Sequence, residues 1–269
     1  MAYTVKELND DTMQILDSSR DGIYLIKGRD RAVLFDTGMD SDLLKPLVDK
    51  YIATPYDVVF SHAHGDHTGR SGEFDGGFMS QNDIEMYSYS TENFQKRNAA
   101  PFCFLPVEKL KPLSEYIDLG DRKLQVIECF GHTPGSIILA DKKNKSVFTG
   151  DAIGSGCGVW MQVDGALSVR RYALNLISAY TKLQDIGVND EWSFYGGHPG
   201  QEYRSRVSAY NPLCMALIQD MITLCAKLVH GSQEYEDSSA REFSTGKPKY
   251  ASYGRAEMIF TAENIDDRR

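Results

Sequence analysis

Three of the six histidines of the chain stand in one short string, Ser61-His62-Ala63-His64-Gly65-Asp66-His67. The apolar run just before this string is typical of a β-strand. The imidazoles therefore lie on a loop at a strand end, where the backbone can turn several of them toward one point. This pattern favours a metal site, and a chain that builds such a site needs a rigid sheet to hold the loop.

Two more histidines and two aspartates share this context. His132 and His198 each follow a strand-like run and stand beside glycine or proline, and Asp36 and Asp151 also follow strand-like runs. If these strands lie in sheets with matching ends, the polar side chains meet at one edge. Ligand sites at strand ends are what α/β architectures favour.

The remaining pattern predicts an α/β fold with mixed sheets covered by helices, because strand-like and helix-like segments alternate. In the helix predicted from Arg171 to Ile186, the apolar side chains favour one face; they are Leu174, Ile177, Leu183 and Ile186. The predicted strands are Gly22 to Ile26, Arg31 to Phe35, Asp57 to Phe60, Leu124 to Phe130, Ile137 to Ala140, Ser146 to Thr149 and Trp192 to Tyr195. The predicted helices are Ser41 to Tyr51, Arg171 to Ile186 and Pro212 to Val229.

No repeat and no linker rich in proline and serine divides the sequence, so residues 1–269 are predicted to form a single domain. Two segments fit the alternation of strands and helices poorly. Residues 81–113 are rich in aromatic side chains, which is typical of either a lid over a site or a loop packed on the core. Residues 231–269 are polar and are interpreted as a C-terminal extension.

Charge and cysteine content narrow the function classes. Lys and Arg total 29 against 38 for Asp and Glu, a formal net charge of −9, which disfavours binding to nucleic acid. The five scattered cysteines form no CxxC pair, which indicates a reducing compartment without a thiolate zinc site. No signal peptide and no long apolar run is found, so we expect a cytoplasmic protein that does not enter the membrane.

The number of candidate ligands exceeds what one ion needs, because a catalytic metal takes three protein ligands and a water. Five imidazoles and two carboxylates suit two divalent ions. This set without thiolate predicts zinc first, with iron or manganese as alternatives. The candidate metal ligands are His62, His64, Asp66, His67, His132, Asp151 and His198.

From about Gly22 to Gly200, these motifs and their order resemble the metallo-β-lactamase superfamily. The resemblance implies an αββα sandwich, in which two mixed β-sheets are flanked by helices. It also implies that His62, His64 and His132 bind the first metal, that Asp66, His67 and His198 bind the second, and that Asp151 bridges them. Asp36 would orient a histidine, since ligating imidazoles usually donate their other N–H to a carboxylate. Asp66 would also accept a proton, so Asp36 and Asp66 are the predicted catalytic residues.

The segment Phe148 to Asp151 and the following Gly156-Cys157-Gly158 resemble hydroxyacylglutathione hydrolases (glyoxalase II). That enzyme type has a lysine directly after this glycine pair, where the present chain has Val159. We therefore predict a binuclear metal-dependent hydrolase that uses a metal-bridging hydroxide to cleave a thioester, ester or lactone in a small molecule. Hydroxyacylglutathione hydrolysis is the alternative. The predicted substrate contacts are Trp160, Met161, Tyr87 and Arg170.

Three other functions remain as hypotheses. A ribonuclease or phosphodiesterase of the same fold shares the form of the string at Ser61 to His67, but the negative charge argues against it. A di-iron redox relative would carry glutamate at the position of His64 and an added flavodoxin-like domain. A binding module without catalysis would not need seven intact ligands. The sequence leaves a homo-oligomer open.

Overall fold

The computed structural model describes residues 3–243 and 246–267. The chain divides into two compact units. The N-terminal unit comprises Met1–Val126 and Asp141–Asn144, and the C-terminal unit comprises Ile127–Ala140 and Lys145–Arg269.

The N-terminal unit is built on a mixed sheet with the strand order β1-β2-β3-β4-β5-β6-β7. Neighbours from β1 to β4 are antiparallel, and those from β4 to β7 are parallel. The parallel part directs the carboxyl ends of β4 and β5 to one edge. The strands are β1 (Thr4–Asn9), β2 (Thr12–Leu16), β3 (Gly22–Lys27), β4 (Ala32–Phe35), β5 (Tyr56–Val59), β6 (Gly77–Met79) and β7 (Leu110–Pro112).

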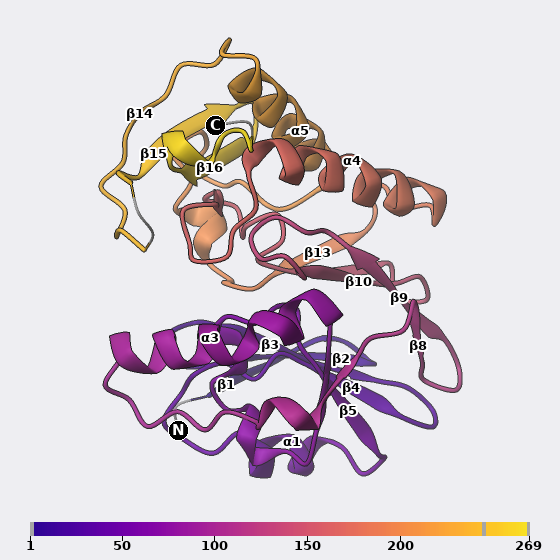
Figure 1. Cartoon of the computed structure of the whole chain (residues 1–269). Helices are drawn as coiled ribbons and strands as arrows, with labels where there is room; N and C mark the ends of the chain where they lie inside the picture. The colour runs from indigo at the N-terminus through magenta and orange to yellow at the C-terminus, as the bar shows by residue number, and fades with distance from the viewer. Residues whose placement is uncertain (1–2, 244–245, 268–269) are drawn as a thin grey trace. The chain divides into compact units, whose positions relative to one another are not determined.

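Three helices accompany this sheet: α1 (Lys45–Tyr51), α2 (Gly65–Thr68) and α3 (Gln81–Arg97) (Figure 1). Val48 of α1 and Tyr87 of α3 are buried in the same apolar core as Leu25 and Leu34 of the sheet. Short 3-10 turns occur at Ser71–Glu73 and Val107–Lys109. The strand β8 (Tyr116–Asp118) then pairs antiparallel with β9 (Lys123–Glu128), whose residues belong partly to each unit.

The C-terminal unit contains two sheets and two long helices. One sheet has the order β13-β11-β10-β9-β8, in which β8 and the first part of β9 are counted with the N-terminal unit, and the other has the order β12-β16-β15-β14. The helices α4 (Val169–Asp185) and α5 (Met215–Val229) pack against each other. The other strands are β10 (Ile137–Asp141), β11 (Ser146–Gly150), β12 (Val159–Trp160), β13 (Ser193–Gly196), β14 (Glu236–Asp237), β15 (Lys249–Tyr253) and β16 (Ala256–Phe260), with 3-10 turns at Gln201–Tyr203 and Ala262–Asn264.

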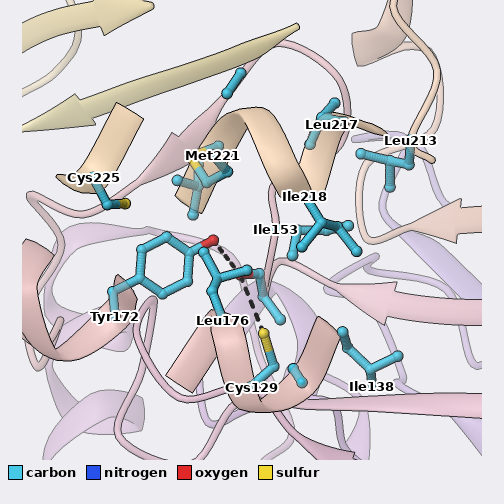
Figure 2. Packing of buried hydrophobic residues seen from close by; sticks show 14 of the residues in the cluster. Cys129, Ile138, Ile153, Tyr172, Leu176, Leu213, Leu217, Ile218, Met221 and Cys225 are labelled. Carbon is cyan, nitrogen blue, oxygen red and sulfur yellow. Dashed lines mark hydrogen bonds between the residues drawn. The ribbon is translucent and has the colours of Figure 1, made fainter. Parts of the chain in front are cut away.

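The core of the C-terminal unit lies between these helices and the sheets (Figure 2). Tyr172 and Leu176 of α4 are fully buried, as are Met221 and Cys225 of α5. The Tyr172 hydroxyl donates a hydrogen bond of 2.8 Å to the carbonyl of Ala152. This fully buried aromatic side chain is therefore tied to the loop that follows β11.

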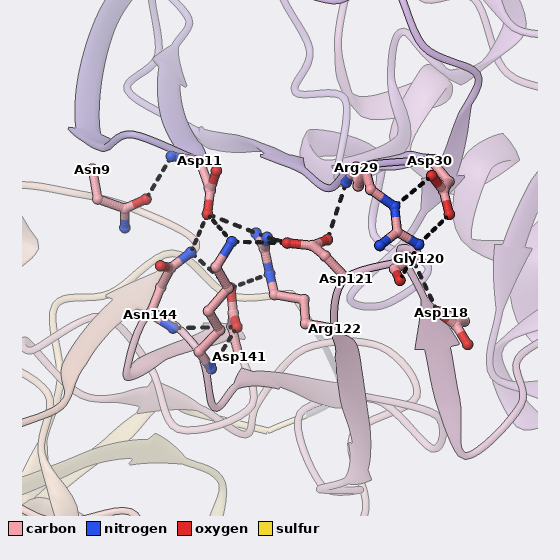
Figure 3. Close-up of polar contacts among 11 residues, drawn as sticks. Asn9, Asp11, Arg29, Asp30, Asp118, Gly120, Asp121, Arg122, Asp141 and Asn144 are labelled. Carbon is pink, nitrogen blue, oxygen red and sulfur yellow. Dashed lines mark hydrogen bonds and ion pairs between the residues drawn. The ribbon is translucent and has the colours of Figure 1, made fainter.

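A cluster of charged residues joins three turns of the N-terminal unit (Figure 3). The Arg122 guanidinium contacts carboxylates of Asp11, Asp121 and Asp141 at 3.3, 3.3 and 2.9 Å. Lys143 contacts Asp11 and Asp121 at 2.9 and 2.8 Å. Hydrogen bonds from Lys143 hold the pKa of Asp11 and of Asp121 below the usual range of a carboxyl group.

The seven predicted strands occur as β3, β4, β5, β9, β10, β11 and β13, with ends within two residues of those expected. The predicted apolar face of the helix beginning near Arg171 is correct for Leu183, which is buried, and for Ile186, which packs against the core, but wrong for Leu174 and Ile177. Leu174 and Ile177 are 64% and 48% exposed, whereas α4 buries a row that includes Tyr172 and Ala179. Across residues 3–243 and 246–267, the structure contains no helix with the length and apolar character needed to cross a membrane.

Candidate metal centre

The histidine string of the N-terminal unit is placed by two parallel strands. β4 and β5 pair in register, with Phe35 opposite Val59, so Asp36 and Ser61 lie just beyond neighbouring strand ends. The Asp36 N–H donates to the Val59 carbonyl at 2.9 Å. The sheet edge therefore fixes the start of the loop that carries the three imidazoles.

Two of these imidazoles point their nitrogens at each other. His62 Nε2 lies 3.1 Å from His64 Nδ1. Two nitrogen ligands of a tetrahedral zinc ion, each about 2.05 Å from the metal, are about 3.3 Å apart. The spacing of the His62 and His64 nitrogens thus fits two ligands of one ion.

Asp36 connects this pair to the third imidazole. One Asp36 carboxylate oxygen accepts the Ser61 N–H at 2.7 Å, and the other lies 2.7 Å from Ser61 Oγ and 2.8 Å from His67 Nδ1. Ser61 Oγ also lies 2.9 Å from His62 Nδ1. One buried carboxylate therefore orients His67 directly and His62 through a hydroxyl.

The backbone conformation at position 36 explains why an aspartate can stand there. Asp36 has φ of 65°, in the left-handed region where aspartate and asparagine are enriched among non-glycine residues. The loop after β5, which carries the histidine string, continues into α2, where Gly65 packs under Phe94 of α3. A Cβ at Gly65 would lie 2.2 Å from that ring, so a larger residue would push the helix away.

The C-terminal unit places a second ligand group in a similar way. β11 and β13 are parallel, with Gly150 opposite Gly196, and Asp151 and His198 follow these strands. Asp151 Oδ2 lies 3.0 Å from His198 Nε2 and 3.7 Å from His132 Nε2. One carboxylate oxygen thus lies near two imidazole nitrogens.

His132 is oriented by the backbone of another segment. Its Nδ1 lies 2.7 Å from the Trp160 carbonyl, which fixes a proton on Nδ1 and leaves Nε2 to bind a metal. The preceding Gly131 accepts the Leu167 N–H at 2.8 Å. A Cβ at Gly131 would lie 2.0 Å from the Tyr172 ring, so this position requires a glycine.

The predicted site residues are thus gathered in two groups, one in each unit. Within the N-terminal unit, the ligand atoms of Asp66 and His67 and those of His62 and His67 lie within 4.8 Å of each other. The donors of both groups are imidazole nitrogens and carboxylate oxygens, which fits zinc and leaves iron and manganese suitable. The N-terminal group is Asp36, His62, His64, Asp66 and His67, and the C-terminal group is His132, Asp151 and His198.

The four residues predicted to contact the substrate do not belong to either of the two ligand groups. Met161 is fully buried in the core of the C-terminal unit, and Tyr87 is buried in that of the N-terminal unit. Arg170 forms a bidentate ion pair with Asp266, both contacts measuring 2.9 Å. Trp160 is half-buried and packs on Phe243 at 5.7 Å between ring centroids. Among these four positions, Trp160 has the surroundings most compatible with contact to a substrate.

Sequence reasoning missed the groups that hold the ligands in place. The histidine string includes Ser61, but its residue type does not indicate that its hydroxyl contacts His62. The contact made by the Trp160 carbonyl comes from the backbone, so no side-chain type predicts it. Ser155 Oγ accepts the His198 N–H at 2.9 Å. Burial raises the pKa of the nearby Cys157 thiol to about 11, so this cysteine stays protonated at neutral pH and is a weak nucleophile.

Replacing Asp36 by asparagine is expected to weaken metal binding by about 10 to 100-fold, as for other groups that orient ligating histidines. Asparagine tolerates the left-handed backbone but cannot accept all three hydrogen bonds made by Asp36. Competition with a chromophoric chelator measures the affinity. Asp57→Asn, on β5 but paired with the exposed Arg31, is the control and should bind metal normally. Equal affinity of Asp36→Asn and the unmodified protein would contradict the orienting role.

Comparison with known proteins finds relatives of the chain. The chain is 28% identical to acyl-coenzyme A thioesterase MBLAC2 of Gallus gallus over 165 residues, or 51% of this chain and 59% of that protein. It is also 28% identical to the Homo sapiens protein of the same name over 188 residues, or 57% and 67% of the two chains. The chain thus spans less than two thirds of the Gallus gallus relative.

A solved structure shares the fold. The crystal structure of the BLEG-1 B3 metallo-β-lactamase matches with a TM-score of 0.56 and 20% identity, over 72% of this chain and 96% of that one. The family model of the metallo-β-lactamase superfamily matches residues 23–198, which include all the predicted metal ligands. The predicted fold is confirmed, and divalent metals are implied by it. The chain belongs to the metallo-β-lactamase superfamily.

Proposed function

We propose that the chain is a thioesterase in which the seven ligands act together on two divalent ions, with zinc as the first candidate. The observation that carries the proposal is the position of Asp151 Oδ2 beside both His132 Nε2 and His198 Nε2. Two bound cations would lower the pKa of a water and supply hydroxide at neutral pH. Family membership and the order of the motifs support joint action of the two ligand groups.

The residues assigned to the site have separate tasks in this proposal. His62, His64 and His132 would hold one ion, and Asp66, His67 and His198 would hold the other. Asp151 would bind both, and Asp36 would keep the protons of His67 and Ser61 on the atoms that face it. Asp66, a carboxylate next to His67, would receive the proton released from water.

Two observations favour an acyl-coenzyme A over a glutathione thioester. The curated relatives are named acyl-coenzyme A thioesterases. Val159, at the position where glyoxalase II carries a lysine, is fully buried in β12 and belongs to the core. The cation that glyoxalase II uses to hold glutathione is therefore replaced by a packed apolar side chain, which argues against glutathione; only the names of the relatives point to coenzyme A, whose thiol is itself polyanionic.

A substrate panel tests this assignment. We expect kcat/KM for a medium-chain acyl-coenzyme A to exceed that for S-lactoylglutathione by about tenfold or more, since one lost or gained contact is worth that much. An aryl ester, a lactone and an RNA complete the panel. A clear preference for S-lactoylglutathione would assign the chain to glyoxalase II, and cleavage of RNA alone would reject acyl hydrolysis.

Metal removal tests the cofactor. Elemental analysis should find about two ions per chain, and chelation should abolish thioester hydrolysis. Zinc, iron and manganese added separately to the apoprotein should restore activity to different extents, which identifies the metal that serves best. A protein that hydrolyses thioesters at full rate without bound metal would contradict the proposal.

A further inference from the structure

The C-terminal hairpin of β15 and β16 lies beyond residues 23–198, the part matched by the family model. It nevertheless contacts β12, whose Trp160 carbonyl meets His132, and the end of the turn that follows His198. β16 pairs in parallel with β12, with Trp160 opposite Ile259. The carbonyl of the same Trp160 meets His132 Nδ1. The hairpin therefore supports the peptide group that orients His132.

The second contact is made by a buried carboxylate. Glu257 of β16 is 1% exposed. It accepts hydrogen bonds from Ser205 Oγ at 2.5 Å, from the Arg206 N–H at 3.0 Å and from the Tyr250 hydroxyl at 2.7 Å. Three donors satisfy a carboxylate that would otherwise be costly to bury. This carboxylate holds the end of a turn to the hairpin.

That turn begins at His198. The Gln201 N–H donates to the His198 carbonyl at 3.2 Å, and the Arg204 N–H donates to the Gln201 carbonyl at 2.8 Å. Ser155 fixes the start of the turn through the His198 N–H, and Glu257 fixes its end one residue after Arg204. The backbone of the turn is thus held at both ends, which restricts the direction of the His198 imidazole.

A second buried side chain closes the same region. Asn211 is 1% exposed, and its amide donates to the carbonyls of Gly156 and Arg255 at 3.0 and 2.8 Å. Gly156 has φ of 106°, and a Cβ there would lie 2.5 Å from the Asn211 carbonyl oxygen. The loop after Asp151, the turn after His198 and the hairpin are therefore packed together without room for rearrangement.

We propose that Glu257 is a positioning residue of the metal centre, which sets the direction of His198 through the turn from His198 to Arg206. This rests on the proposed function, because it takes His198 and Asp151 as metal ligands. In this role Glu257 would touch neither metal nor substrate. Its carboxylate replaces water at three donors and keeps the turn in one conformation.

The test compares Glu257→Ala with Glu257→Gln in the full-length protein. Alanine removes all three acceptor contacts, whereas glutamine keeps one oxygen for Arg206 and Tyr250, and its amide N–H can donate to the Ser205 hydroxyl oxygen. We expect Glu257→Ala to weaken binding of one Co²⁺ ion by about tenfold and to change the visible absorption of the cobalt-loaded protein. Glu257→Gln should largely restore both properties.

A matched variant separates positioning from loss of stability. Leu183→Ala removes a fully buried side chain at the far end of α4 and should lower the free energy of unfolding by about 2 to 5 kcal/mol with an unchanged cobalt spectrum. If Glu257→Ala also loses only stability, and its spectrum and Co²⁺ affinity equal those of the unmodified protein, the proposal is wrong. Absence of Co²⁺ binding by the unmodified protein would instead reject the proposed function.

Discussion

Replacing Asp151 by asparagine is expected to release at least one metal ion and to lower kcat/KM for a thioester by about three orders of magnitude, or about 4 kcal/mol of transition-state stabilisation. Asp151 Oδ2 lies 3.0 Å from His198 Nε2 and 3.7 Å from His132 Nε2. An amide oxygen can occupy the same place, but it brings no negative charge between two cations. The change therefore removes charge while it preserves shape.

Metal content and steady-state kinetics, measured on the same preparation, check this expectation. Asp190→Asn is the control, because Asp190 belongs to the same unit and is exposed. It should keep both ions and full activity, and circular dichroism should match for both variants. An Asp151→Asn protein with two ions and normal activity would show that Asp151 does not bridge.

The strands and the positions of the candidate ligands at their ends could be predicted because their signals are local. Short apolar runs rich in β-branched residues that end at glycine or a polar residue specify strands such as β4 and β11 with little help from the rest of the chain. The ligands follow these strand ends, so the sequence also indicates where they lie. Asp36 shows the limit, since its contacts with Ser61 and His67 depend on the register between β4 and β5.

Helix faces were harder to predict, because residue type alone does not decide burial. The sequence of α4 offers Leu174 and Ile177 as apolar candidates, yet the structure buries Tyr172 and Ala179. A small residue allows close helix packing, and a tyrosine becomes buried when its hydroxyl finds an acceptor such as the Ala152 carbonyl. Which side chains of α4 are buried therefore depends on the elements that pack against it, and a single sequence does not specify that packing.

The two segments that interrupt the predicted pattern have regular structure. Residues 81–113 begin with α3, whose buried positions are Asp83, Tyr87, Ser90 and Thr91, so its inner face carries few aliphatic side chains. Residues 231–269 contain β14, β15 and β16, and polar side chains such as Glu257 face inward there. Hydrophobic periodicity is weak wherever buried polar groups find partners. A lid formed by residues 81–113 stays a prediction.

Replacing Arg122 by methionine is expected to lower the free energy of unfolding by about 3 to 5 kcal/mol, because it leaves a buried carboxylate without its cation. The Arg122 side chain is 5% exposed, and its partner Asp141 is fully buried. Methionine fills a similar length but cannot compensate this charge or donate a hydrogen bond. Because the cluster joins three turns, the substitution should destabilise the whole N-terminal unit.

Urea unfolding followed by fluorescence measures this loss, and Lys143→Met is the matched control. Lys143 contacts Asp11 and Asp121 of the same cluster, but its side chain is 46% exposed, so water screens these contacts and the loss should be much smaller. The double variant Arg122→Met with Asp141→Asn should recover part of the lost stability, because it also removes the unpaired charge. If Arg122→Met costs no more than Lys143→Met, the buried ion pair does not stabilise the fold.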